Sequence, residues 1–447
     1  MAATTYLESH GAKEGVGKDV QKTREAGGKP VSRLEEAEAC VSELRLLRSG
    51  LLSVSDKSMA AATARAASLQ RRAAEVLDTA ATAAEERAVA KGATSVEAQE
   101  SRAHRMWLRG EGLLSIDDMC PSEDAENLLT RAVKLDPSLL NAWNALAECF
   151  WRRGELDLAR NCIRRGLERK RTVQGLRMLS MVVREPITSL TIDAANESVA
   201  LAKEALSLDL DSCQSWECLG NAYLGQFAAN DQARLDIVKL AQKAYGKAVS
   251  KPEADWRPYL HFNRATSCMW AADFEEALNA YDKVSAIDAS RCCDGEKDTV
   301  YELLRLLHAS VNERGGLKQK RLYSLRAQLR SRAETMSAAG ALADLDAGRN
   351  ATTLLWCVVL ADVEDIQNSR SGPGISWKLA VSHDEIFFVL CCYGSSRTSM
   401  LRPGTAATIS GAILGRVFTN KGNEVFDFPF VQIDIESSIK VHDSLQA

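Results

Sequence analysis

The chain has 447 residues, enough for about two to four domains with sizeable hydrophobic cores. Its 56 basic and 60 acidic residues give a formal net charge of −4, so the chain is not globally basic and any nucleic-acid contact must come from a local patch. No apolar stretch is long enough to cross a bilayer, and the N-terminus has no apolar signal segment, so no membrane partner is expected.

The first hundred residues predict a tail followed by helices. Residues 1–32 are rich in Gly, Lys, Glu and Thr without an apolar period, which is typical of a disordered tail. Apolar residues recur at helical spacing in the Ala-rich stretches 33–49 and 58–90. We therefore expect N-terminal helices within residues 33–100.

Between residues 101 and 293, pairs of helical segments recur with a shared order of residue types. Each unit has a large apolar residue, then a small residue and an aromatic one, with further alanines after a turn. The best units carry these residues at Trp143, Leu146, Ala147, Phe150, Gly154 and Ala159, at Trp216, Leu219, Gly220 and Tyr223, and at Ala265, Phe274, Ala277 and Tyr281. A short insertion follows Tyr223, and residues 173–210 form a divergent unit. The pattern is typical of tetratricopeptide repeats (TPR), whose hairpins must stack because none buries its apolar face alone.

The C-terminal part changes from helical to strand periodicity. Residues 294–335 predict capping helices with a basic end, and residues 336–350 predict a linker. Five β-rich runs then follow within residues 351–437: LLWCVVLADV, SWKLAVSH, EIFFVLCCYG, ATISGAILGRVF and VFDFPFVQID. The predicted fold class is mainly α, a TPR superhelix followed by a small all-β OB-fold barrel or a comparable β domain.

The sequence offers no motif for catalysis, metal binding or a cofactor. His261, His308 and His383 are isolated from other ligand-type residues, and no nucleophile has a base beside it. The twelve cysteines fit a reducing compartment, and adjacent pairs such as Cys292-Cys293 are a poor geometry for a disulfide or a metal cage. We therefore expect a non-enzymatic protein without a metal or other cofactor.

Positions 2, 5, 9 and 12 of the first helix in a TPR hairpin face the concave groove. This register predicts a groove lined by Asn141, Asn144, Glu148 and Trp151, by Gln214, Glu217, Asn221 and Leu224, and by Tyr259, Phe262, Thr266 and Met269. In the divergent unit Arg184 falls at position 12. Asparagine amides can hydrogen-bond an extended peptide, and Arg184 can pair bidentately with a carboxylate. The alternative is that these are ordinary solvated helix faces. Positions 5 and 9 hold no lysine, which disfavours a co-chaperone with a carboxylate clamp.

A basic run opens the last predicted helix. Lys318, Lys320 and Arg321 follow one another closely, with Arg314 just before them. Such a run can bind phosphates, although from the residues alone a solvated helix end is the favoured interpretation.

Several blocks of the chain resemble one TPR family. AENLLTRAVKLDP, LNAWNALAECFWRRGELDLA, LSMVVRE, SWECLGNAYL, LHFNRAT and LKQKRL are similar to segments of the tetratricopeptide repeat protein five (Strap) family, across roughly residues 101–435. That family joins a TPR array to a C-terminal OB fold, the order predicted here. The resemblance is strong in the repeats and weaker in the β domain.

The resemblance implies a function in tubulin autoregulation. In this function the groove binds the N-terminal peptide of nascent tubulin at the ribosome, touching its protein and RNA surface, and triggers decay of tubulin mRNA through mRNA-decay adaptor proteins. By motif, the groove set is Arg184 and Lys134 together with Asn144, Asn221, Tyr259 and Asn263. Lys318, Lys320 and Arg321 match the basic residues that touch the ribosome, which makes a functional basic run the favoured interpretation.

The alternative implied by the resemblance is a stress-responsive nuclear scaffold that binds acetyltransferase coactivators. Its OB domain would contact chromatin or protein partners. We therefore expect the chain in the cytoplasm, and in the nucleus under this alternative.

One position departs from the family pattern. Tyr259 stands where the family has an acidic residue before the block LHFNRA. A tubulin peptide that begins Met-Arg-Glu needs an anion for its arginine, worth roughly 1.5–3 kcal/mol for a charged hydrogen bond. Glu253 or Asp255 in the preceding turn is the expected substitute.

Overall fold

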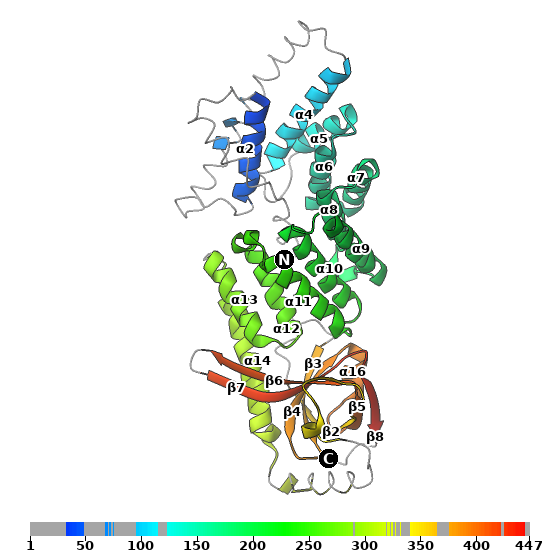
Figure 1. The fold of residues 1–447 in the computed structure, drawn as a ribbon, viewed down its shortest axis with the longest axis vertical. Helices are drawn as coiled ribbons and strands as arrows, with labels where there is room; N and C mark the ends of the chain where they lie inside the picture. Colours follow the sequence, from blue (N-terminus) through cyan, green and yellow to red (C-terminus); the bar gives the residue numbers. More distant parts are fainter. Residues whose placement is uncertain are drawn as a thin grey trace. The chain divides into compact units, whose positions relative to one another are not determined.

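The computed structural model describes most of the chain from residue 95 onward and short stretches before it (Figure 1). The described residues are 33–48, 68–69, 71–72, 75, 95–114, 123–288, 291–318, 320–321, 323–324, 327, 331, 340–363, 375–421 and 424–442. The predicted tail 1–32 and most of the predicted helix 58–90 lie outside them. The chain forms two compact units, one of residues 1–222 with 248–257 and one of residues 223–247 with 258–447.

The first unit consists of helical hairpins. Its elements are α2 (Arg33–Arg48), α4 (Ser95–Leu114), α5 (Glu123–Leu135), α6 (Leu140–Arg152), α7 (Leu156–Arg169), α8 (Val173–Val183), η2 (Ile187–Ser189), α9 (Ile192–Leu208), the first part of α10 (Cys213–Ala229) and η3 (Pro252–Trp256). The first helices α4, α6 and α8 pack directly on one another, which makes them the inner layer. Small residues permit the close approach of helices within a hairpin, because a Cβ at Gly166 would lie 3.3 Å from the Cβ of Trp143.

The helices of the second unit are the rest of α10, most of α11 (Leu235–Val249), α12 (Pro258–Trp270), α13 (Phe274–Ile287), α14 (Asp294–Asn312) and η4 (Arg314–Gly316). Position 1 of the predicted register coincides with the first residue of α6, α8, α10 and α12. Among the described helices, none combines the length and hydrophobicity that a bilayer span requires.

The C-terminal residues form one mixed sheet, with η5 (Leu342–Asp344) before it and α16 (Ser395–Met400) within it. Its strands are β1 (Gly348–Asn350), β2 (Leu355–Asp362), β3 (Ile375–Ser382), β4 (Phe387–Tyr393), β5 (Ala406–Ser410), β6 (Ala412–Lys421), β7 (Glu424–Ile433) and β8 (Ser438–His442). The strand order is β1-β6-β7-β4-β3-β2-β5-β8, in which β4 and β7 pair in parallel.

This order confirms a small C-terminal β domain, but the expectation of a closed barrel is wrong. The edge strands β1 and β8 are not paired with each other, so the described sheet is open. Gly411 alone separates β5 from β6, which lie near opposite ends of the strand order, and its φ of +71° favours glycine. Its carbonyl oxygen accepts from Ser437 Oγ at 3.1 Å and from Arg349 Nη1 at 3.2 Å. Side-chain hydrogen bonds therefore stabilise the connection between β5 and β6.

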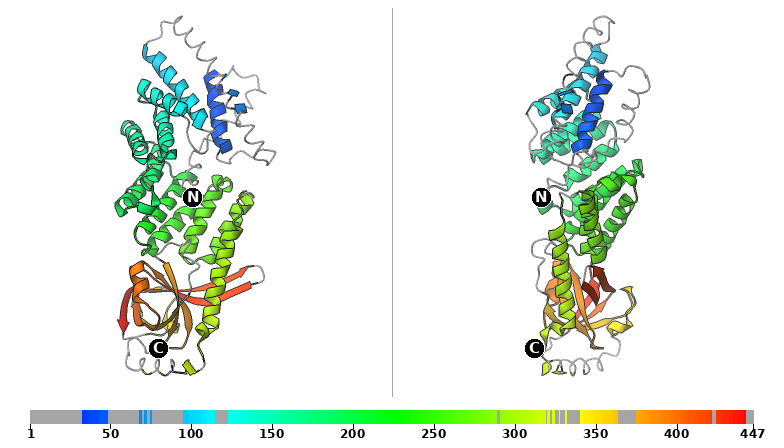
Figure 2. Two further views of the ribbon diagram at one scale, coloured as in Figure 1. Left: turned by 180° about the vertical axis from the view of Figure 1, so that it is seen from behind. Right: turned by 90° about the vertical axis from the view of Figure 1, so that its left-hand side faces the viewer.

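Within the second unit, the sheet packs on the last helices. Tyr393 Oη donates to the carbonyl oxygen of Trp270 at 2.7 Å, and Gln432 Nε2 donates to that of Ala271 at 2.8 Å. Helix α14 packs against β3, β4 and β7 (Figure 2). The insertion after Tyr223 also contributes, because the N–H of Ile435 donates to the carbonyl of Ala233 at 2.9 Å.

Candidate peptide-binding site

Arg184 occupies the C-terminal end of α8 on the inner layer of the first unit. The helix starts at Thr172, whose side chain accepts from the N–H of Gly175 at 3.2 Å. It ends at Val183 because Pro186 follows shortly and disfavours helical backbone before it. The Nε of Arg184 donates to the carbonyl oxygen of Ser180 at 3.1 Å, and neither Nη atom has a partner among the described residues. The guanidinium is thus held by one nitrogen and can offer two to a carboxylate.

The anchor of Arg184 is itself buried and fixed. Ser180 is fully buried, and its hydroxyl donates to the carbonyl of Ser198 in α9 at 2.9 Å. The hydroxyl of Ser198 donates back to the carbonyl of Ser180 at 2.8 Å. Burial raises the pKa of the Cys218 thiol in α10, and the nearby charge of Arg184 opposes that rise. Arg184 therefore lies close to Cys218, and Ser180 connects α8 to α9.

Two further arginines are buried near this point, and the sequence analysis missed both. Arg177 in α8 donates from Nη1 to Ser212 Oγ at 3.2 Å, and Arg257 forms an ion pair with Glu217 at 2.7 Å. Burial, with a smaller effect from the charge of Arg257, lowers the pKa of Arg177 to about 10. Arg257 is neutralised by Glu217, so Arg177, which shares helix α8 with Arg184, is the one of the two that adds positive charge to this part of the inner layer. Arg177 is at position 5 of the same register in which Arg184 is at position 12. The register therefore assigns Arg177 to the groove-facing positions but does not show that it is buried.

Three of the four predicted groove residues of α6, namely Asn144, Glu148 and Trp151, are buried, whereas Asn141 is exposed. Asn144 is 5% exposed, and Glu148 forms a buried ion pair with Arg152 of its own helix. Arg152 also donates from Nη1 to the carbonyl of Leu114 at 2.9 Å. These side chains stabilise the stacking of α6 on α4 and offer little polar surface to a ligand.

The other predicted groove residues are dispersed. Lys134 is exposed in the last turn of α5, a second helix of its hairpin, and Asn221 is half-buried in α10. In the second unit, Asn263 is half-buried, and Tyr259 is 9% exposed beneath the guanidinium of Arg291, whose Cζ lies 3.6 Å from the ring centroid. Tyr259 therefore contacts a cation within its own unit.

The basic run is exposed. Lys318, Lys320 and Arg321 are accessible side chains without an ion pair to any described residue. The backbone N–H of Arg321 donates to the carbonyl of Lys318 at 2.9 Å, which brings these residues into one turn. Arg314 lies apart, with its Cζ 5.8 Å from the ring centroid of Phe387.

The aromatic residues of the β domain mostly belong to its core. Phe388, Phe426 and Phe428 are buried, whereas Phe387 is partly exposed. Buried rings are not available for base stacking, so these residues do not supply the platform that a single-strand binder uses.

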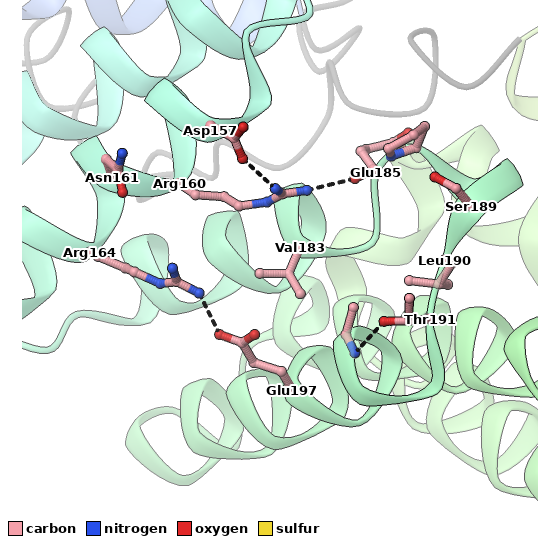
Figure 3. Close-up of a pocket in the computed structure, with 12 residues that line it drawn as sticks. Asp157, Arg160, Asn161, Arg164, Val183, Glu185, Ser189, Leu190, Thr191 and Glu197 are labelled. Carbon is pink, nitrogen blue, oxygen red and sulfur yellow. Dashed lines mark hydrogen bonds and ion pairs between the residues drawn. The ribbon is translucent and has the colours of Figure 1, made fainter.

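A cavity of about 560 Å³ lies beside α7, and its lining includes Val183 and Glu185 but not Arg184 (Figure 3). Its walls come from α7, the α8–α9 connection and the first turns of α9. Arg160 donates from Nη1 to Asp157 Oδ1 and from Nη2 to the carbonyl of Glu185, both at 2.8 Å. Arg164 pairs with Glu197 at 3.0 Å. No sequence motif marks this cavity, because its residues come from separate segments.

Comparison with known proteins supports the predicted resemblance. The chain is 32% identical over 241 residues to Tetratricopeptide repeat protein 5 of Homo sapiens, covering 52% of this chain and 53% of the relative. It is 33% identical over 253 residues to the Mus musculus protein, covering 54% of each. The chain is thus similar to Tetratricopeptide repeat protein 5 over about half of its length. It spans about half the length of the curated relatives it matches. No family model matches the chain.

Solved structures with some likeness are also TPR-type arrays or larger assemblies. The human IFIT1 dimer with PPP-AAAA aligns with a TM-score of 0.41 at 14% identity, covering 72% of this chain and 70% of that one. A thermophilic TPR protein of Thermus thermophilus aligns with a TM-score of 0.37 at 16% identity, covering 44% of this chain and 98% of that one. The sequence relatives and the stacked hairpins support a TPR-type adaptor or protein-binding role.

Proposed function

We propose that this chain is a non-enzymatic adaptor that binds the N-terminal peptide of nascent tubulin at the ribosome and promotes the decay of tubulin mRNA. The sequence similarity to Tetratricopeptide repeat protein 5 supports this proposal. Such an adaptor acts in the cytoplasm and needs mRNA-decay proteins as further partners.

The observation that carries the proposal is the presentation of Arg184. Its Nε is anchored on Ser180, while both Nη atoms have no partner among the described residues. A peptide that begins Met-Arg-Glu brings a glutamate carboxylate, which two parallel N–H donors of a guanidinium can bind. The buried Arg177 adds positive potential behind this contact.

The arginine of the same peptide requires an acidic partner. Tyr259 cannot supply one, but Glu253 and Asp255 are exposed in η3, within the same unit as Arg184. We assign them this role, because among the described residues neither carboxylate is engaged in an ion pair.

The exposed basic run supplies the ribosome contact in this proposal. Lys318, Lys320 and Arg321 present three cations on one turn, and such a cluster gains affinity for RNA phosphates by releasing counterions. Binding through these residues should therefore weaken as the salt concentration rises.

Ribosomes stalled on the β-tubulin N-terminus provide the direct test of Arg184. Pulldown from a translation extract should recover them with the unaltered chain, and Arg184→Ala should reduce recovery at least tenfold. Arg165→Ala is the matched control, because Arg165 is an exposed arginine of α7 outside the inner layer. Equal recovery with Arg184→Ala would show that the groove assignment is wrong.

The basic run is tested separately. Replacing Lys318 and Lys320 together by Glu should abolish co-sedimentation with ribosomes and leave the affinity for the free tubulin peptide unchanged. Unchanged co-sedimentation would exclude these lysines from the contact. Circular dichroism of the variant shows whether a loss of both activities comes from misfolding.

A further inference from the structure

The cavity beside α7 includes one residue of the inner layer, Val183 of α8, and otherwise consists of residues outside that layer. None of the predicted groove residues lines it, and all of its lining residues lie within the first unit. Its volume of about 560 Å³ falls within the range of roughly 300–1,000 Å³ that is usual for ligand pockets. The cavity can therefore hold a side chain with its flanking backbone.

The charges that line the cavity do not balance. Three carboxylates, those of Asp157, Glu185 and Glu197, face two guanidinium groups, those of Arg160 and Arg164, which leaves one negative charge in excess. Arg160 is paired with Asp157, and Arg164 with Glu197. The carboxylate of Glu185 has neither a hydrogen bond nor an ion pair among the described residues, although its residue is only partly exposed. Glu185 is therefore the carboxylate of this cavity that has no ion-pair partner among the described residues.

Burying the Glu185 carboxylate without an ion-pair partner disfavours its ionised form. Burial raises the pKa of its carboxyl above the usual range, and the neighbouring charge of Arg184 offsets only part of that rise. A cation brought into the cavity would remove this cost, whereas an added anion would increase it.

The cavity also has an apolar part. Val183 and Leu190 line it together with Ala194. Figure 3 shows Val183 between the two arginine contacts, below Arg160 and above Glu197. Long basic side chains place a hydrocarbon stem on apolar surface and a charged head near a carboxylate, so they match both features.

We infer that this cavity binds a lysine or arginine side chain carried by an exposed segment of a partner protein. The charged head pairs with Glu185 and the stem packs on Val183 and Leu190. Arg184 does not line the cavity, but Val183 and Glu185 on either side of it do, so this contact lies next to the proposed peptide contact.

The test uses the full chain with labelled Leu and Val methyl groups. In methyl NMR titrations, the tripeptide acetyl-Leu-Arg-Ala-amide should shift the Val183 and Leu190 signals saturably. The same peptide with citrulline in place of arginine, which lacks the charge, should bind at least fivefold more weakly. Free L-arginine should also bind at least fivefold more weakly, because a partner segment has backbone to place in the cavity.

Variants locate the contact. Glu185→Gln should weaken binding of the arginine peptide at least fivefold, whereas Glu168→Gln, an equal charge change at an exposed site of α7, should leave it unchanged. Equal binding of the arginine and citrulline peptides would overturn the inference without any variant. Stronger binding of acetyl-Leu-Glu-Ala-amide would also overturn it and assign the cavity to an anion. Tighter binding of free L-arginine than of the arginine peptide would also overturn it and indicate that the ligand is a small molecule instead of a partner segment.

Discussion

Arg257 holds a single oxygen of Glu217 with two nitrogens, Nε at 2.9 Å and Nη2 at 2.7 Å, in a place where both side chains are less than 10% exposed. Breaking a buried ion pair leaves an uncompensated charge, which typically costs about 3–5 kcal/mol. Glu217→Gln should therefore lower the free energy of unfolding of the repeat array by about that amount, measured by urea denaturation. Asp427→Asn, which breaks the exposed pair with Arg416, should cause no measurable change.

The raised pKa of Glu185 predicts a pH-dependent effect on stability. Since the folded state favours the protonated carboxyl, ionised Glu185 destabilises the fold above its folded pKa, and this cost disappears as the pH falls through that pKa. Glu185→Gln should therefore raise the melting temperature modestly at pH 7 and leave it unchanged near pH 4. A lower melting temperature at pH 7 would contradict the uncompensated carboxylate.

Two glycines should respond to alanine with opposite signs. A Cβ at Gly415 in β6 would overlap the ring of Phe430, so Gly415→Ala should destabilise the sheet by about 1–3 kcal/mol. A Cβ at Gly246 in α11 would meet nothing within 4 Å, so Gly246→Ala should stabilise by roughly 0.5–1 kcal/mol. Thermal unfolding of both variants measures the difference. Equal effects would mean that the ring of Phe430 can move aside.

Thiol labelling should distinguish one cysteine from the other described ones. Burial raises the pKa of Cys357 and Cys392 to about 12, so both remain protonated and enclosed near pH 8. Cys292 is exposed. Mass spectrometry after brief iodoacetamide treatment should find Cys292 modified first among the described cysteines, and Cys292→Ser should remove that signal. Early modification of Cys357 would indicate opening of the sheet.

The helical part of the fold was predictable because its pattern is local and repeated. The register placed position 1 at the first residue of α6, α8, α10 and α12 without structural information. The same register missed the role of Arg177, because a charge at position 5 of an apolar helix gives no sign that it will be buried. It also could not show that Asn144 is enclosed by packing.

The β domain was predictable in its strands but not in its closure. The predicted runs contain β2 and β4 and all but the first residue of β3 and β7, and the fourth run covers most of both β5 and β6. The short strand β1 lies in the predicted linker, and β8 lies wholly beyond the predicted domain end. Whether the sheet closes depends on the strand order, which is set by pairing between residues far apart in the sequence and is not recorded in any local pattern. The cavity beside α7 escaped prediction for the same reason.

The docking of the sheet on the last hairpin has a practical consequence. A helical-repeat array needs a polar cap at its end, and in the second unit the sheet covers that end. Tyr393 and Gln432 bind carbonyls of the α12–α13 turn, and Trp377 contacts the ring of Phe274 at a centroid distance of 5.8 Å. Deleting the sheet would uncover this apolar surface, so a truncated chain should aggregate. Loss of activity on truncation would then report insolubility rather than a function of the sheet, and point substitutions are the sounder way to separate the two.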